Sequence, residues 1–263
     1  MDLATIIGLV GGTGAVILGA IMEGTHLLAL VSPSAFFIVV VGSYCATMLG
    51  FPMETTKSAV AIIKKAFSKP EISAGQMIQT MVGFATKARR EGLLGLEEET
   101  EAIEDQFLKR GLQLVVDGTD IEMVRNILET DIAFLEARHR EGQEYFGAFG
   151  GYCPTFGIIG TVLGLIHALG SAGGDPTKTV QAISVAFIAT FYGILAANAV
   201  FLPISFKLKA NSAKEVLLRE VMLEGILSIS AGDNPRIVEE KLKAFLPPSE
   251  KLEIKAEGEE EKK

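Results

Sequence analysis

The residues of this chain that could take part in chemistry are mainly hydroxyl and amide side chains within long apolar runs. They are Thr155, Thr161, Thr190, Tyr192, Asn198 and Ser205. Most threonines in membrane helices only bond back to a carbonyl of their own helix, so none of them marks a site by itself. An ion pathway normally needs an ionisable group within the membrane, and these runs contain no Asp, Glu, Lys or Arg. If the protein conducts a cation, we therefore expect another chain to supply the titratable ligand.

Other kinds of site find little support in the sequence. It has no phosphate-binding loop, no dinucleotide-binding fingerprint, no nucleophile-elbow motif and no His and Cys at metal-ligand spacing. Its histidines, His26, His139 and His167, are far apart, and His167 fits an interfacial residue better than an ion ligand. Cys45 and Cys153 each lie alone in an apolar run, which favours packing over a disulfide or a metal site. We predict no enzymatic activity, no catalytic residue, no metal site and no cofactor.

The elements that must position the hydroxyls are four apolar runs, each long enough to cross a bilayer as a helix. They cover residues 3–22, 25–53, 145–174 and 179–206, whereas nearly all charged residues lie in 54–144 and 207–263. This pattern excludes a single water-soluble globule. It predicts an all-α, polytopic membrane protein with four transmembrane helices and a helical cytoplasmic lobe. The net charge of −8 and the lack of a dense basic patch argue against nucleic acid as a partner.

The distribution of lysine and arginine predicts which side of the membrane each segment faces. Lys178 is the only basic residue in the two links that join the first run to the second and the third to the fourth. Lysines directly follow the second and fourth runs, at Lys57, Lys64, Lys65, Lys69, Lys207, Lys209 and Lys214. Because positive residues stay in the cytoplasm, we expect a multi-pass protein of the bacterial inner membrane with both termini in the cytoplasm.

This orientation divides the chain into five parts. Transmembrane helices occupy residues 1–53 and 145–206, and a cytoplasmic helical lobe occupies residues 54–144. Cytoplasmic C-terminal helices occupy residues 207–248, and a charged tail at 249–263 is expected to be disordered.

Local signals predict where several helices begin. Ser32, Asp175 and Asn234 each precede a proline, as N-caps do when proline takes the first helical position. Ser73 and Gln76 form a capping-box pattern that opens a helix through about residue 90. Composition predicts one helix over 97–111, and apolar residues at helical spacing from residue 121 to 135 predict a long helix into the third run. A separate helix is expected after the fourth run, around residues 216–227.

Small residues and prolines add two further predictions. Gly8 with Gly12, and Gly160 with Gly164, have the spacing that permits close helix approach, and another glycine at position 157 extends the second pair. Pro154 and Pro203 lie in the third and fourth runs toward their cytoplasmic ends. Each is either a tolerated kink or a hinge that links the membrane half to the lobe.

The lobe carries a basic turn followed by an acidic turn. Lys87, Arg89 and Arg90 precede a short break, and Glu97 begins a run of three glutamates. Such a run is usually a solvated face, but two turns of opposite charge on an exposed lobe also fit a charge-steered docking surface.

Three motifs and the four-span layout resemble the MotA/PomA family, the rotating stator subunit of the bacterial flagellar motor. The motifs are ARREGLLGLE at 88–97, CPTFGIIGTVLG at 153–164, and AFIATFYG at 186–193 with FLP at 201–203. The resemblance extends to about residue 248. It implies a ring, pentameric in known complexes, around a pair of single-span MotB-type partners that contribute the ion-binding aspartate. It also implies that ion passage turns the ring and that the lobe pushes on the rotor protein FliG.

The resemblance also assigns roles to particular residues. Arg89 or Arg90, and Glu97, match the rotor-facing charges of the family, and Pro154 and Pro203 match its two functional prolines. Thr161 and Thr190 match hydroxyls that line the ion path of sodium-driven members. Several proton-driven relatives carry alanine at the position of Thr161. Of the two possible coupling ions, Na⁺ and H⁺, the resemblance therefore favours Na⁺.

Three alternatives remain at this stage. The first is an ExbB/TolQ-type proton-channel subunit that energises an envelope machine, although such relatives have three spans and an external N-terminus. The second is a secondary transporter for a small solute, which would typically show internal repeats and discontinuous midplane helices. The third is a passive membrane scaffold, which would not need an ion path.

Overall fold

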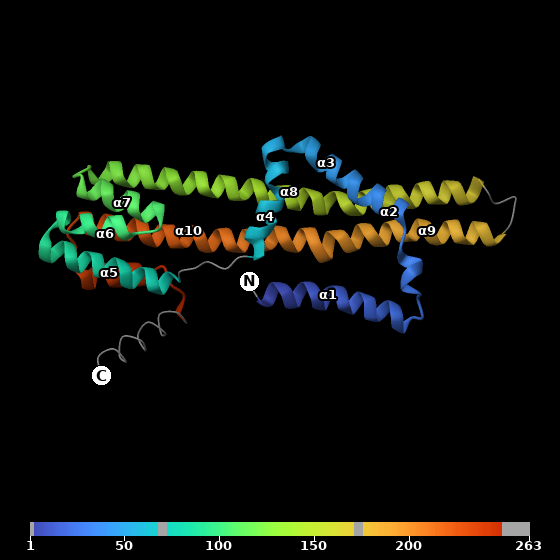
Figure 1. The fold of residues 1–263 in the computed structure, drawn as a ribbon, viewed down its shortest axis with the longest axis horizontal. Helices are drawn as coiled ribbons and strands as arrows, with labels where there is room; N and C mark the ends of the chain where they lie inside the picture. Colours follow the sequence, from blue (N-terminus) through green and yellow to red (C-terminus); the bar gives the residue numbers. More distant parts are fainter. Residues whose placement is uncertain (1–2, 68–72, 171–175, 249–263) are drawn as a thin grey trace. The chain divides into compact units, whose positions relative to one another are not determined.

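Every element in the described part of the chain is helical, which confirms the predicted all-α class. The structure is a computed structural model that describes residues 3–67, 73–170 and 176–248 (Figure 1). Contacts divide the chain into unit 1, residues 1–69 and 139–210, and unit 2, residues 70–138 and 211–263. The tail predicted to be disordered, 249–263, lies outside the described residues.

Three helical stretches among the described residues are long and apolar enough to cross a membrane. They are Pro33–Gly50, the apolar part of α8 (Ile121–Gly170), and the apolar part of Pro176–Ser230. Helix α1 (Leu3–Met22) carries no charge, but the part of it whose side chains are described, Ile6–Met22, is shorter than these spans. The chain is therefore a membrane protein with at least three helices of spanning length.

The second apolar run becomes a spanning helix only at its predicted Ser32 cap. Residues Leu27–Leu30 form a 3₁₀ turn (η1), and the helical stretch starts at Pro33 with α2 (Pro33–Phe36). A π turn (η2, Phe37–Val41) and α3 (Gly42–Gly50) complete it. Ser32 is extended, as residues before proline tend to be, and its hydroxyl accepts a hydrogen bond from the Ala35 amide at 3.3 Å. The predicted Ser32 cap is confirmed, whereas the predicted Asp175 cap lies outside the described residues.

No break separates the fourth predicted span from the helix that follows it. Helix α9 (Pro176–Leu195) continues through a π turn (η4, Ala196–Phe201) into α10 (Leu202–Ser230). Pro203 is the second residue of α10 and supplies no amide to the carbonyl four residues earlier. A π turn accommodates this irregularity without ending the helix. The prediction of a separate helix near residue 216 was therefore wrong.

Unit 2 is a helical lobe with an apolar core. Its own helices are α5 (Ala74–Glu91), α6 (Glu97–Ala102), α7 (Gln106–Val116) and α11 (Pro235–Lys243), with the 3₁₀ turn η3 (Leu93–Leu96) after α5. The first part of α8 and the second part of α10 complete it. Fully buried side chains from these helices meet in the core, among them Ile78, Met81, Leu96, Leu112, Leu128, Met222, Ile226 and Leu242.

Helix starts within unit 2 follow the local signals, with one exception. The Ser73 capping box and the Asn234 cap are both confirmed. The single helix predicted over 97–111 is instead two helices. Helix α6 ends at Ala102, and Asp105 caps α7 by accepting a hydrogen bond from the Leu108 amide at 2.9 Å. Aspartate favours such caps because its carboxylate satisfies amides that have no partner inside the helix.

Helix α4 (Met53–Phe67), in unit 1, crosses α8 instead of running along it (Figure 1). The Thr55 hydroxyl donates a hydrogen bond to the Glu141 carboxylate on α8. Two turns farther along α4, Ile62 contacts Gly142, where an added Cβ would lie 3.2 Å from the Ile62 Cγ2 atom. Pairing and packing therefore fix one face of α4 against α8.

Candidate functional site

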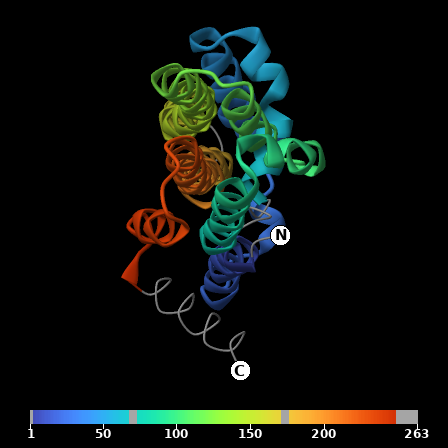
Figure 2. The same ribbon diagram turned by 90° about the vertical axis from the view of Figure 1, so that its left-hand side faces the viewer.

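Helices α8 and α9 touch along a face of small residues, and Figure 2 shows them nearly end-on beside each other. A Cβ atom added to Gly157 would lie 2.9 Å from the carbonyl oxygen of Ala189. A Cβ added to Gly160 would lie 2.7 Å from the Ala189 Cβ, and one added to Gly164 would lie 2.6 Å from the Ala186 Cβ. These short distances confirm the predicted close packing on this glycine face. A larger residue at any of the three positions would separate the helices.

The other glycine pair makes no such contact. An added Cβ at Gly8 or Gly12 would have no heavy atom of the described residues within 4 Å beyond its own helix. The same spacing thus produces a close helix contact at one place in the chain and not at the other.

The α8–α9 contact brings the two predicted ion-pathway threonines together. The hydroxyls of Thr161 and Thr190 are hydrogen-bonded to each other. Thr161 Oγ1 also lies 3.0 Å from the carbonyl oxygen of Gly157 on its own helix and 3.0 Å from that of Ala186 on α9. A hydroxyl carries a single proton, so each threonine donates to one of these oxygens at a time and can accept from its neighbour. Four oxygen atoms from two helices therefore gather in one half-buried cluster, which is the kind of ligand that hard cations bind.

The two prolines occupy different surroundings. A Cβ added at Gly193 would lie 2.5 Å from the Cys153 carbonyl oxygen and 3.1 Å from the Pro154 Cα atom. Pro154 therefore lies where the backbones of α8 and α9 approach closely, and α8 continues through it without a break. Pro203 is exposed in the first turn of α10, which follows the π turn.

Tyr192 is a residue whose connection the sequence did not reveal. Its hydroxyl donates a hydrogen bond to the Leu30 carbonyl at 2.8 Å and accepts one from the Ser32 amide at 3.2 Å. These bonds attach the turn before α2 to α9, two residues beyond Thr190. The sequence indicated that this hydroxyl would have a partner, since a tyrosine in an apolar run usually forms a hydrogen bond. It did not indicate which residue the partner would be.

The predicted rotor-facing charges surround one turn of unit 2. Helix α5 ends at Glu91, Gly92 adopts a φ of 81°, and Glu97 begins α6. The arginines at the end of α5 thus lie close in sequence to the glutamates at the start of α6, and each charge suits its helix end. Arg90 pairs with Glu91 at 2.7 Å, whereas Arg89 and Glu97 are exposed and form no ion pair within the described segments.

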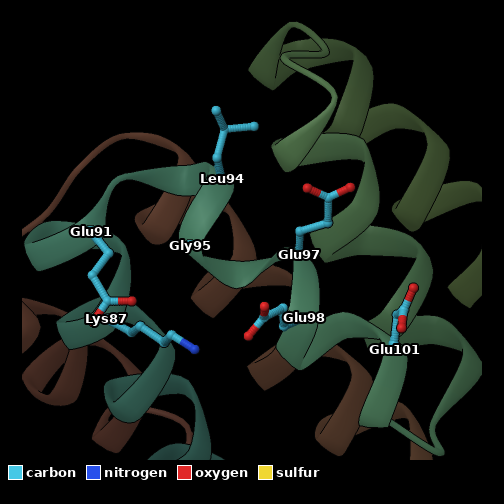
Figure 3. A pocket seen from close by; sticks show the side chains of 7 residues that line it. All are labelled: Lys87, Glu91, Leu94, Gly95, Glu97, Glu98 and Glu101. Carbon is cyan, nitrogen blue, oxygen red and sulfur yellow. The ribbon is translucent and has the colours of Figure 1, made fainter.

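A depression of about 410 Å³ lies beside this turn (Figure 3). Four carboxylates line it with a single ammonium group; the lining residues are Lys87, Glu91, Leu94, Gly95, Glu97, Glu98 and Glu101. Lys87 Nζ donates a hydrogen bond to Glu99 Oε1 at 2.8 Å. This bond raises the pKa of Lys87, so it favours the charged form of the amine. The depression is therefore mostly acidic, and an acidic surface suits a partner with complementary positive charges. Among the described residues, no group of three His, Cys, Asp or Glu side chains could hold a metal.

Comparison of the sequence with known families gives two matches. Residues 99–221 match the MotA/TolQ/ExbB proton channel family, and residues 6–92 match the motility protein A N-terminal family. Motility protein A of Bacillus subtilis (strain 168) is 36% identical over 98% of this chain and 96% of its own length. Chemotaxis protein PomA of Vibrio alginolyticus is 37% identical over 94% of this chain and 96% of its own length.

Two solved structures are similar over nearly the whole chain. A chain of C. jejuni MotAB aligns with a TM-score of 0.90 and 38% identity, covering 94% of this chain and 97% of that one. A chain of the flagellar MotAB stator complex from Bacillus subtilis aligns with a TM-score of 0.90 and 36% identity, covering 96% and 99%.

The glycine contact can be tested by adding a single methyl group. We expect Gly157→Ala to destabilise unit 1 by about 1–3 kcal/mol, because the new methyl would overlap the backbone of α9. Gly151→Ala on the same helix is the matched control, since nothing lies within 4 Å of the added atom. Thermal unfolding of the purified full-length variants measures the difference. Equal midpoints for the two variants would contradict the close contact.

Proposed function

The chain belongs to the MotA/PomA family of motility proteins, and we propose that it is a flagellar motor stator subunit that forms an ion channel with a MotB-type partner. The observation that carries this proposal is the full-length similarity to chains of two solved MotAB assemblies. Residues 99–221 match a family that includes MotA, TolQ and ExbB proteins alike, so this match does not distinguish between them. Residues 6–92 match the motility protein A N-terminal family, and this match favours a stator over an ExbB/TolQ-type subunit.

The ion path divides its chemistry between two chains. The Thr161–Thr190 cluster offers neutral oxygen atoms, and the apolar runs contain no Asp, Glu, Lys or Arg. A permeating cation needs a compensating charge or a titratable group, which the MotB-type partner supplies. The coupling ion is Na⁺ or H⁺, and the paired hydroxyls favour Na⁺ because they provide oxygen ligands of the kind that hard cations bind. The protein moves an ion and carries out no covalent chemistry.

The assembly is a homo-oligomeric ring, most simply a pentamer, in the bacterial inner membrane. Its subunit has four transmembrane helices, α1 being the additional one, with both termini in the cytoplasm. The membrane parts are residues 1–53 and 145–206, and the cytoplasmic parts are residues 54–144 and 207–248. Support comes from the charge-free sequence of α1 and from the lysines that follow the second and fourth runs.

The cytoplasmic lobe passes torque to FliG. Arg89, Arg90 and Glu97 make the charged contact with the rotor, since they are exposed around one turn and two of them have no ion-pair partner in the described residues. Pro154 and Pro203 couple ion passage to movement of the helices. Pro154 does so at the close α8–α9 contact, and Pro203 at the π turn before α10.

The division of labour between the chains predicts that this chain alone is not a channel. Vesicles that contain only the purified chain should take up Na⁺ or H⁺ no faster than empty vesicles, because the spans lack the titratable ligand. Cells without their own stator should swim only when this gene and its partner gene are both supplied. Robust flux through the chain alone would rule out the proposed mechanism.

The hydroxyl cluster predicts a particular response to sodium. Thr161→Ala removes the hydroxyl shared by Thr190 and the Ala186 carbonyl, so half-maximal swimming speed should require a severalfold higher Na⁺ concentration. Thr161→Ser keeps the hydroxyl and serves as the matched control. Swimming speed against Na⁺ concentration is the measurement. An unchanged sodium response in the alanine variant would remove the basis for preferring Na⁺.

The exposed charges of the lobe predict a loss of torque without a loss of assembly. Reversal by Glu97→Lys, or by Arg89→Glu together with Arg90→Glu, should reduce the torque of tethered cells by more than half, because like charges would then face the rotor. Glu122→Lys, an exposed acidic residue on α8, is the control. Membrane levels and co-purification with the partner should stay normal. Full torque in both reversed variants would identify these charges as an ordinary solvated face.

A further inference from the structure

Helix α4 has a face that the other described residues of unit 1 leave exposed. Its buried residues are Thr55, Thr56 and Ala66, and Thr55 pairs with Glu141 in unit 1. On the other side Met53 is 54% exposed and Val60 is 67% exposed. Together with the lysines of the same helix, these two apolar side chains make the exposed side of α4 amphipathic.

The exposed residues form a regular stripe of two chemical kinds. Met53, Lys57, Val60 and Lys64 follow one another at intervals of three or four residues, so they lie on one face over successive turns. Apolar and basic side chains alternate along it. Lys57 and Lys64 are exposed and form no hydrogen bond or ion pair with any described residue. We call these four residues the α4 stripe.

The orientation of α4 suits a helix that lies at a membrane surface. Helix α3 belongs to a stretch of spanning length that ends at Gly50, and α4 begins at Met53 after a two-residue turn. Because α4 runs across α8 (Figure 1), it lies flat in the surface when the apolar part of α8 stands along the bilayer normal. A helix in that position can place apolar side chains at the acyl boundary while lysines extend to the headgroups.

We propose that the α4 stripe is a binding site for the headgroups of anionic phospholipids. Met53 and Val60 contact the upper acyl chains, and the ammonium groups of Lys57 and Lys64 contact lipid phosphate oxygens. Charge argues for a lipid of this class, because a chain with a net charge of −8 is repelled by an anionic surface except where lysines are concentrated. The proposal requires only that the chain spans a membrane, and it is independent of the role as a stator.

The sequence allows a direct measurement, because it contains no tryptophan. Val60→Trp in the otherwise unchanged full-length chain places a single fluorophore within the α4 stripe. The protein is reconstituted in vesicles of phosphatidylcholine and phosphatidylglycerol, in which one lipid or the other carries brominated acyl chains. Bromine quenches tryptophan only at close range, so the two series give the relative affinity of the stripe for the anionic lipid.

We expect a severalfold preference for phosphatidylglycerol that high salt weakens. Adding Lys57→Gln and Lys64→Gln should bring the preference close to equal quenching by the two lipids, because each lysine near the surface contributes up to roughly fivefold. Replacement of both lysines by arginine should preserve the preference, since the charge remains. Lys214→Gln, an exposed lysine on α10, should leave it unchanged.

Three outcomes would overturn the proposal. Equal quenching by the two lipids would mean that the stripe does not select anionic headgroups. A preference that survives both glutamine substitutions would place the selectivity elsewhere. An absence of quenching by either lipid would mean that another protein surface, such as a second copy of the chain, covers the stripe.

Discussion

The close approach of α8 and α9 is the contact on which the membrane part of this protein depends. Hydrocarbon gives two apolar helices no hydrophobic reason to associate, so close packing and interhelical hydrogen bonds must hold them together. Gly157, Gly160 and Gly164 remove the side chains that would otherwise separate the two backbones. The Thr161–Thr190 hydrogen bond forms across the same contact. Packing and polar chemistry thus have one structural cause.

The α8–α9 contact provides oxygen ligands for a cation but no ionisable group. Thr161, Thr190 and two backbone carbonyls supply oxygen atoms with partial negative charge, but no group that ionises. Neutral oxygen atoms can replace part of the hydration shell of a cation, and they cannot balance its charge in a medium of low dielectric constant. A channel built on this cluster therefore needs a carboxylate from a second chain, which agrees with the similarity to MotAB complexes.

Charged residues have separate tasks in the two units. In unit 1 they begin where the apolar helices end, and on α4 they alternate with exposed apolar residues along one face. In unit 2 they surround the Gly92 turn, where arginines end one helix and glutamates begin the next. The first arrangement suits a lipid surface, since hydrocarbon and headgroups lie within one side-chain length of each other. The second suits a protein partner, because opposite charges fix its orientation.

The sequence by itself determined the helical class, the apolar stretches and the start of several helices. These features depend on neighbouring residues, as when Ser32 and Ser73 cap the turn that directly follows them. It also identified the glycine face of α8 and, through the family resemblance, the threonines, prolines and charged residues of the candidate site. The break between α6 and α7 was missed because the composition of residues 97–111 favours a helix throughout. The new helix begins where the Asp105 carboxylate accepts a hydrogen bond from the Leu108 amide.

Only the tertiary structure decided which distant residues meet. Thr161 and Thr190 are 29 positions apart, and the Tyr192 hydroxyl bonds to Leu30 over 162 positions. The same glycine spacing forms a helix contact at Gly160 and none at Gly8. Spacing along a helix establishes which residues share a face, but the opposing surface comes from a remote part of the chain. That surface, and not the local pattern, determines whether a face is packed, hydrogen-bonded or left exposed.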